Sequence, residues 1–309
     1  MTARVICVGH AALDRIYRIA KFPPGPAKVR ALEHVESGGG MAANAAATIA
    51  RLGGKVELWS RIGDDDAGRK IRDSLKLAKV DVRNVQSFDN ARSSTSAIIV
   101  DDKGERLIVG SRDTGMPSDT SWLPMERIAE VDAVLVDVRW LEAARAVMSR
   151  ARAEGVITVL DADLGAREAL PELLALADYA IFAEPALADF APDGGLEERL
   201  ARVASLGVRH AGVTRGAAGY AWREADPKTG KLSGVHETKG LVVDVVDTTG
   251  AGDAFHGAIT IFLAEGMEVR AAVEAANAVA ALKCTRLGCR AGLPTRLELE
   301  RFLAQRRPA

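Results

Sequence analysis

Cysteine is scarce in this sequence. Three occur among 309 residues, at Cys7, Cys284 and Cys289. An odd number of cysteines argues against a disulfide framework. The cysteines also lack the spacing of zinc ligands, and the five histidines are scattered along the chain. We therefore expect buried, reduced thiols and a cytoplasmic protein.

An excess of charge of either sign is also missing. The chain carries 41 Lys and Arg against 42 Asp and Glu, a net charge of −1, so it suggests neither a nucleic-acid partner nor an anionic membrane surface. The first residues contain no long apolar run, so we expect no signal peptide and no membrane span. With 48% hydrophobic and 27% charged residues, the composition is typical of a globular α/β protein.

Two common phosphate-binding signatures are absent from the sequence. There is no Walker A pattern and no complete G-x-G-x-x-G, which argues against P-loop and dinucleotide-binding enzymes. Internal repeats and low-complexity tracts are absent too.

The most informative stretch that is present is VVDVVDTTGAGDAFHGAITIFL, residues 242–263. Its β-branched run 242–246 predicts a buried strand, and a glycine-rich turn then opens an apolar helix. Free N–H groups and the helix dipole make such a turn an anion site. Asp253 lies in the first turn, where a lone Asp usually favours the helix start. The alternative is a catalytic base beside the anion site.

From about Val131 onward, strands alternate with helices, which predicts a parallel sheet in an α/β fold. Earlier strands flank the segment FPPGPAK, and a hairpin follows at 93–109. We expect these strands to form a small β-sheet lid, from segments at about 14–37 and 93–111. The acids of GDDDAG, from Gly63, precede a helix, and capping is preferred there to a metal site.

Two further groups of residues are candidates for binding. Asp14 follows the first strand, where it is either a solvated turn acid or a ligand in the crevice at the strand ends. Three glycines, Gly38 to Gly40, precede a clear helix, with Asn44 near its start. By itself this pattern is equally consistent with a tight turn.

Taken together, these motifs resemble the two signatures of the PfkB (ribokinase-like) carbohydrate kinases. DTTGAGD at 247–253 is similar to the second signature and GGG-x3-N to the first. The resemblance implies a ribokinase-like three-layer α/β/α fold with a mostly parallel sheet and a small β-sheet lid, as one kinase domain over 1–309. It also implies ATP and Mg²⁺ as cofactors, and we expect a homodimer that forms through the lid.

The resemblance further implies roles for single residues. Asp253 would deprotonate a sugar hydroxyl, while the amides of Gly250, Ala251 and Gly252 hold the transferred phosphoryl group. The sugar would be oriented by Asp14, Gly39, Gly40 and Asn44. ATP would contact Thr214, Gly216, Gly219 and Asn277, and a potassium-type ion would be held by Asp247 and Thr249. Many members have N-x-x-E after the strand near Phe182, whereas this chain has Glu184-Pro185-Ala186-Leu187, so Glu184 is the candidate for a contact with hydrated Mg²⁺.

Several blocks, such as DRIY at 14–17 and VDVRW at 136–140, are similar to the sulfofructose kinase branch. In that branch a lid lysine, an asparagine and the arginine of the DVRW block hold a sulfonate. Lys28 and Arg139 match two of these places, whereas Gly110 stands at the third, with Ser111 or Arg112 as substitutes. Lys28 could instead be a solvated lid residue, and Arg139 could pair with Asp137 or another acid.

The function predicted on this basis is ATP-dependent phosphorylation of a primary hydroxyl on a ketose-like sugar, with 6-deoxy-6-sulfofructose as one substrate. A neutral ketohexose such as fructose, or a ribose or nucleoside, is the alternative substrate. A catalytically inactive sugar or nucleotide sensor is the alternative class, and the intact Asp253 argues against it.

Overall fold

The structure is a computed structural model that describes residues 2–226 and 228–306. A nine-stranded sheet runs through the molecule in the order β13-β12-β11-β10-β9-β8-β1-β4-β5. It is parallel from β11 to β5, whereas β12 and β13 are antiparallel additions at one edge. Its strands are β1 (Arg4–Val8), β4 (Lys55–Gly63), β5 (Val85–Phe88), β8 (Ala133–Asp137), β9 (Ile157–Ala162), β10 (Tyr179–Ala183), β11 (His210–Thr214), β12 (Tyr220–Glu224) and β13 (His236–Thr238).

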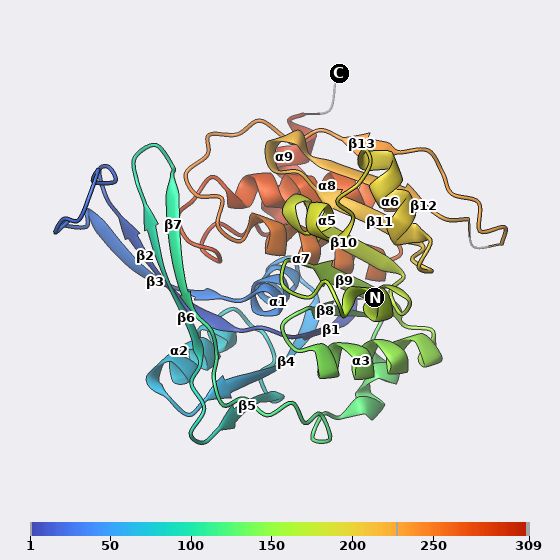
Figure 1. Cartoon of the computed structure of the whole chain (residues 1–309), viewed down its shortest axis with the longest axis horizontal. Helices are drawn as coiled ribbons and strands as arrows, with labels where there is room; N and C mark the ends of the chain where they lie inside the picture. The colour runs from blue at the N-terminus through green and yellow to red at the C-terminus, as the bar shows by residue number, and fades with distance from the viewer. Residues whose placement is uncertain (1, 227, 307–309) are drawn as a thin grey trace.

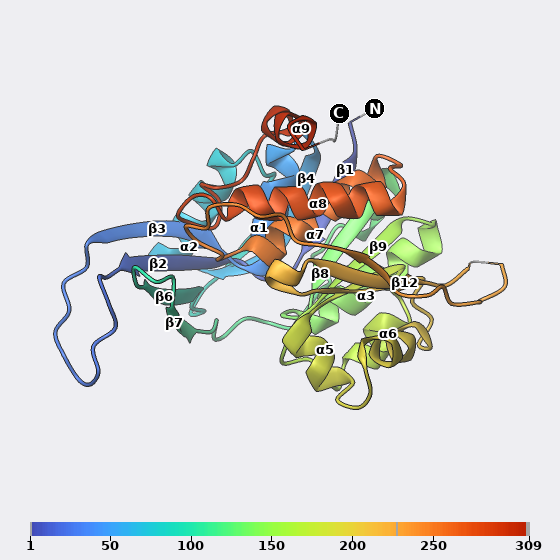
Figure 2. The same ribbon diagram turned by 90° about the horizontal axis from the view of Figure 1, so that it is seen from above.

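Helices cover both faces of this sheet (Figures 1 and 2). One face carries α1 (Met41–Arg51), α2 (Asp66–Leu77), α7 (Ala251–Ala264), α8 (Val269–Lys283) and α9 (Arg296–Ala304). The other carries η1 (Met125–Glu130), α3 (Leu141–Glu154), α4 (Leu170–Leu174), α5 (Glu184–Phe190) and α6 (Leu196–Ala204). The predicted three-layer α/β/α fold is confirmed.

Alternation along the strands separates the two cores. In β1, Val5 and Cys7 pack with α1 and α7, whereas Ile6 and Val8 pack with α3. Successive side chains of a strand point to opposite faces, so a continuous apolar run is what a doubly covered sheet requires. In the described residues, no helix is both long and apolar enough to cross a membrane.

A second sheet of four strands, the lid, projects from one side of the main body (Figure 1). Its order is β3-β2-β6-β7, made from β2 (Ala12–Arg18), β3 (Glu33–Gly39), β6 (Ser94–Val100) and β7 (Arg106–Ser111). The end of β3 leads through Gly40 directly into α1. The lid is therefore tied to the helix that carries Asn44.

The acids at the start of α2 cap the helix, as predicted. Asp65 is the N-cap residue, and its carboxylate accepts hydrogen bonds from the Gly68 N–H at 2.7 Å and the Ser93 N–H at 2.9 Å. A carboxylate at this position satisfies free amides of the first turn.

The prediction of a buried strand at 242–246 is wrong. The segment has no strand pairing, and Val242, Val245 and Val246 are 90%, 61% and 52% exposed. A short apolar run cannot be distinguished from other buried or ligand-facing segments by its pattern alone. Here the run lies along the wall of a cavity that it shares with Asn277, Ala280 and Ala281, in the second half of α8.

Candidate active site

The start of α7 separates two cavities. The lid cavity, of about 640 Å³, lies between the lid and the main sheet and is lined at this turn by Thr249, Gly250 and Asp253. The α8 cavity, of about 430 Å³, is lined at the same turn by Thr248, Ala251 and Gly252. Neighbouring residues of one turn thus face two different cavities.

The backbone at this turn is open to an anion. Gly250 adopts φ 75°, a left-handed conformation that suits glycine, and no side chain in the described structure caps the helix. The Ala251 N–H donates to the carbonyl oxygen of Thr248 at 3.2 Å, so the turn itself uses this amide. Among the described residues, the N–H groups of Gly250 and Gly252 donate to no acceptor. Two of the three predicted amides are therefore free.

A chain of hydrogen bonds orients Asp253. The Nδ2 group of Asn44 donates to Asp253 Oδ2 at 2.8 Å, and Arg290 Nε donates to Asn44 Oδ1 at 3.1 Å. Because a guanidinium only donates, it fixes the Asn44 oxygen on its own side and turns the amide nitrogen toward Asp253. Asn44 was predicted to bond a sugar hydroxyl, and its first partner here is instead the carboxylate.

Arg290 was missed at the sequence level. It lies in a loop after α8, 246 residues from Asn44, and also donates to Ser74 Oγ at 2.9 Å and to the Gly39 carbonyl at 3.4 Å. Burial lowers the pKa of Arg290 to about 10, so the guanidinium stays charged near neutral pH. No local pattern reveals such a contact, because it depends on how the chain ends meet.

Asp253 is set to accept a proton near neutral pH. Burial raises its pKa to about 6, the hydrogen bond from Asn44 opposes this rise, and the negative charges of Asp14, Asp137 and Asp163 add to it. A base with a pKa close to the working pH combines an ionised state with useful proton affinity. Burial and Asp253 also hold the pKa of Asp161 well above its usual value.

Asp14 faces the lid cavity, as predicted, and is 9% exposed. Its carboxylate accepts hydrogen bonds from Ser96 Oγ and, at 3.5 Å, from the thiol of Cys289. A side chain on Gly39 would overlap this carboxylate, which explains a glycine at that position. Gly40 adopts φ 92° at the start of α1 and also lines the cavity.

Asp137 is a second residue that sequence reasoning did not assign. It is fully buried at the end of β8, and its carboxylate accepts the N–H groups of His10 at 2.7 Å, Ala42 at 3.0 Å and Arg139 at 2.9 Å. It therefore joins the end of β1, the start of α1 and the end of β8. Strand ends that meet at one sheet edge are the usual place for such a residue.

Two arginines line the lid cavity, Arg112 and Arg139. Arg139 Nη2 pairs with Asp163 Oδ2 at 2.9 Å, not with the side chain of Asp137. Both guanidiniums approach Gly165, since a Cβ built there would lie 3.2 Å from Arg139 Nη1 and 3.7 Å from Arg112 Nη2. They form the cationic part of the cavity wall.

Lys28 does not line the lid cavity. It lies in the exposed loop between β2 and β3, which extends beyond the lid strands (Figure 2). Pro23, Pro24 and Pro26 in this loop cannot donate to a sheet, which keeps the loop out of the strand ladder. Arg112, which was named from the sequence as a substitute near Gly110, does line the cavity.

The α8 cavity collects four of the five residues predicted for ATP. Thr214, Gly216 and Gly219 reach it from the turn between β11 and β12, and Asn277 reaches it from α8. Asn277 Nδ2 also donates to Thr238 Oγ1 at 2.6 Å, which fixes its side chain. Glu184 is exposed at the start of α5 and does not line this cavity.

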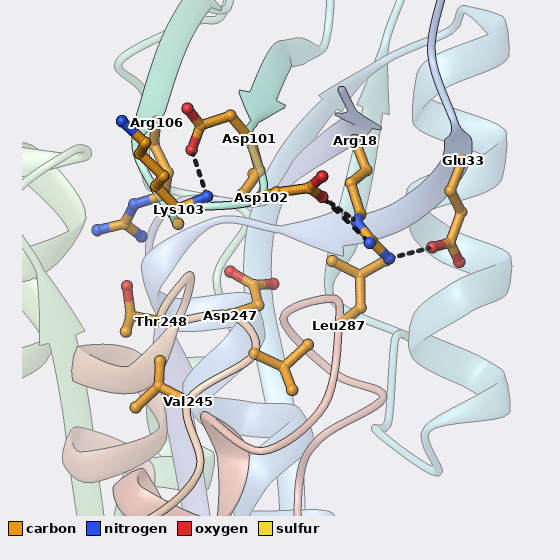
Figure 3. Close-up of a pocket in the computed structure, with 13 residues that line it drawn as sticks. Arg18, Glu33, Asp101, Asp102, Lys103, Arg106, Val245, Asp247, Thr248 and Leu287 are labelled. Carbon is orange, nitrogen blue, oxygen red and sulfur yellow. Dashed lines mark hydrogen bonds and ion pairs between the residues drawn. The ribbon is translucent and has the colours of Figure 1, made fainter. Parts of the chain in front are cut away.

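A third hollow, the outer cavity of about 550 Å³, lies between the lid and the segment 245–248 (Figure 3). Asp247 is on its wall, with its Oδ1 accepting the Thr249 N–H at 2.8 Å. Within the described part of the chain, no group of three or more His, Cys, Asp or Glu side chains could hold a metal ion.

Comparisons with known proteins agree with this geometry. Residues 2–296 match the pfkB family of carbohydrate kinases. The ATP-dependent ribose-1-phosphate kinase of Halopiger xanaduensis is 33% identical over 307 residues, covering 98% of this chain and 99% of that protein. The fructokinase of Vibrio alginolyticus is 29% identical over 293 residues, covering 86% of this chain and 92% of its own.

Solved structures show the same fold. The crystal structure of a candidate ribokinase from Agrobacterium tumefaciens is 40% identical and superposes with a TM-score of 0.92, covering 99% of this chain and 98% of that one. Arabidopsis thaliana ribokinase, solved with ribose and ATP, superposes with a TM-score of 0.83 over 98% of this chain and 99% of its own, at 23% identity.

We predict that Asp253→Asn stabilises the protein above pH 7. A carboxyl with a folded-state pKa of about 6 and an unfolded value near 3.8 binds more protons when folded, so stability falls as pH rises between the two values. The variant avoids this loss, which is about 1–3 kcal/mol. Urea unfolding at pH 8 and pH 4 should show a gain at pH 8 that disappears at pH 4. The exposed control Asp193→Asn should show neither, and an equal change at both pH values would contradict the prediction.

Proposed function

This chain belongs to the pfkB family of carbohydrate kinases, and on that premise we propose that it transfers the γ-phosphoryl group of ATP to a primary hydroxyl of a sugar held in the lid cavity. The observation that carries the proposal is the turn at the start of α7. One side of it presents the Asp253 carboxylate to the lid cavity, and the other presents Gly252 to the α8 cavity.

ATP fits the α8 cavity for two reasons. Its wall includes the exposed Val242 and Val245 and the half-buried Val243, which offer an apolar surface to a purine ring. Its other end reaches the free amide of Gly252 at the start of α7, where a helix N-terminus favours phosphate. Thr214 and Gly216 lie along the same wall.

The proposed reaction begins with the sugar hydroxyl beside Asp253. The carboxylate accepts the hydroxyl proton as the oxygen attacks the γ-phosphorus, and ADP leaves into the α8 cavity. The amides of Gly250 and Gly252 stabilise the charge on the transferring oxygens. Asn44, oriented by Arg290, keeps Asp253 directed at the hydroxyl. Asp14 and the second Asn44 amide hydrogen orient the sugar.

Mg²⁺ would be bound chiefly by the triphosphate oxygens, where it screens their charge. The protein side offers carboxylates rather than a closed cage, which suits an ion that keeps several waters. Glu184 follows β10 at the carboxyl edge of the sheet and is exposed, so it is the candidate for a contact with a water of that ion.

We further propose that the sugar carries an anionic group, with a sugar phosphate such as ribose 1-phosphate as the first candidate. Arg112 and Arg139 converge on one side of the lid cavity, and arginine is suited to the planar oxygens of phosphate. The relative from Halopiger xanaduensis, which is similar to this chain over almost its whole length, is an ATP-dependent ribose-1-phosphate kinase. A sulfonated ketose is a second anionic candidate for the same arginines.

A neutral sugar is the competing substrate. Asp163 already pairs with Arg139, and this ion pair weakens the attraction of the Arg139 guanidinium for an anionic ligand. The relative from Vibrio alginolyticus is a fructokinase. An anionic substrate must therefore compete with Asp163 or rely on Arg112.

We also propose a homodimer that forms through the lid. On the face of the lid away from the cavity, strand pairing aligns Tyr17, Ile99 and Leu107 in one row, and Val109 lies two residues along from Leu107. Leu107 and Val109 are 49% and 58% exposed, and β7 is an edge strand that pairs with β6 on one side only. Exposed apolar edges of this kind favour pairing with another chain.

The first prediction tests the reaction class. ATP consumption is measured on a panel of ribose, ribose 1-phosphate, fructose, sulfofructose and a nucleoside, and at least one sugar should be phosphorylated. Asp253→Asn should lower turnover by at least about 10²-fold while still binding ATP, because it removes the general base. A complete absence of turnover on the panel would favour a sensor, and a nearly normal kcat of Asp253→Asn would refute the mechanism.

The second prediction concerns the anionic group. Arg112→Ala and Arg139→Ala should each lower kcat/KM on ribose 1-phosphate about 10–150-fold relative to wild type, the range for one charge-assisted hydrogen bond. Both should change little on ribose. Arg150→Ala, which removes an exposed arginine from α3, is the matched control. Equal losses on both sugars, or a wild-type preference for ribose or fructose, would contradict an anionic substrate.

The third prediction concerns assembly. Light scattering at micromolar concentration should give a dimer for wild type and a monomer for Leu107→Arg, because a charge replaces an apolar side chain in the proposed contact. Leu77→Arg alters a similarly apolar side chain that is 85% exposed on α2 and should remain dimeric. A monomeric wild type would disprove the lid dimer.

A further inference from the structure

A fully buried lysine lies directly behind the turn that opens α7. Lys283 ends α8 with 0% of its surface exposed, which is rare for lysine unless it is paired. Its Nζ donates to the backbone oxygen of Asp247 at 2.8 Å and lies 3.6 Å from Asp247 Oδ2. The charge therefore points at the residue that begins the DTTGAGD segment.

Asp247 links the two loops that form this part of the site. Its Oδ1 accepts the Thr249 N–H and its Oδ2 accepts the Gly288 N–H, both at 2.8 Å. Its own N–H donates to the Cys284 oxygen at 3.1 Å. Burial by itself raises the pKa of Asp247, but the Lys283 charge and these hydrogen bonds outweigh it and lower the pKa below its usual value. The residue is therefore an ionised carboxylate with an internal counter-charge.

A free monovalent cation does not fit these residues. The expected site at Asp247 and Thr249 would need several oxygens that are free to surround the ion. The carbonyl and one carboxylate oxygen of Asp247 already face the Lys283 ammonium, and the other carboxylate oxygen is used by Thr249. A second positive charge beside a buried ammonium would be strongly repelled.

The path by which a cation would reach Asp247 from solvent also argues against a cation site. Asp247 lies on the wall of the outer cavity, below Asp101 and Asp102 of the lid, and is 3% exposed (Figure 3). An ion entering from this cavity would meet an aspartate whose charge is already neutralised from the protein interior. Lys283 itself does not line the cavity, so solvent ions cannot displace it from that side.

We propose that the Lys283 ammonium replaces a monovalent metal ion behind the phosphate-binding turn, so that this chain is independent of potassium. Lys283 is a positioning residue. It holds Asp247, and through Asp247 it holds the backbone of Thr249 and Gly250 in the conformation that presents free amides. The activity measurement rests on the proposed kinase function, whereas the stability measurement does not.

The wild-type protein gives the direct test. It is transferred to choline chloride and titrated with KCl, NaCl or LiCl at constant ionic strength, with melting temperature and sugar phosphorylation as the two measurements. Neither the melting temperature nor the rate of phosphorylation should depend on which ion is added. A saturable, potassium-specific rise in either quantity would overturn the proposal.

Variants at Lys283 show whether its charge is responsible. Lys283→Ala removes the ammonium and opens space, so in choline chloride it should melt roughly 5–10 °C lower than wild type and lose at least about tenfold in turnover. Potassium should restore both quantities better than lithium, since the smaller ion fits the vacated space less well. Lys283→Met fills the same space without charge and should show similar losses that no ion restores.

Two controls separate the possible failures. Lys76→Met, on the exposed side of α2, should behave as wild type in every salt. If no sugar is phosphorylated at all, the proposed function fails, but the melting series still decides the ion question. If Lys283→Ala does not fold in choline chloride, recovery of folded protein in KCl but not in LiCl supports the proposal. Lys283→Met with wild-type stability and turnover would refute it.

Discussion

The hydrogen bond between Asn44 and Asp253 holds the two halves of the site together. It joins α1 to α7 across 209 residues of sequence, and Arg290 fixes its direction from the opposite side of Asn44. Because α1 continues directly from the lid and α7 begins at the turn between the two cavities, this bond ties the wall of the lid cavity to that turn.

Charge balance is the second constraint on the molecule. Asp137, Asp161 and Asp253 meet at the carboxyl edge of one sheet, and burying several carboxylates together is unfavourable unless each is compensated differently. Asp137 accepts three backbone N–H groups, and the pKa of Asp161 is raised well above its usual value. Of these three carboxylates, Asp253 is the one that lines the lid cavity, and its pKa is raised to about 6.

Sequence patterns predicted the elements of this structure better than its contacts. The alternation of strands and helices, the turn before α7 and the start of α1 all follow from local preferences, and they are where the patterns placed them. The run 242–246 was misassigned because an apolar surface for a ligand has the same composition as a buried strand. The role expected of Lys28 stays a prediction, because the residue lies in the exposed lid loop and a resemblance cannot show where such a long loop extends. Arg290, Asp137 and Lys283 were missed because their partners are distant in sequence, so no spacing rule connects them.

The separation of Asn44 and Asp253 along the chain also governs when the site can form. Contacts between distant residues are made late in folding, because the intervening chain must be closed first. During synthesis, the lid and β1 leave the ribosome early, whereas α7, Lys283 and Arg290 emerge with the last fifth of the chain. The apolar faces of α1 and β1 that pack on α7 therefore stay exposed in a nascent chain until α7 has been made, and transiently exposed apolar surface of this kind is prone to aggregation.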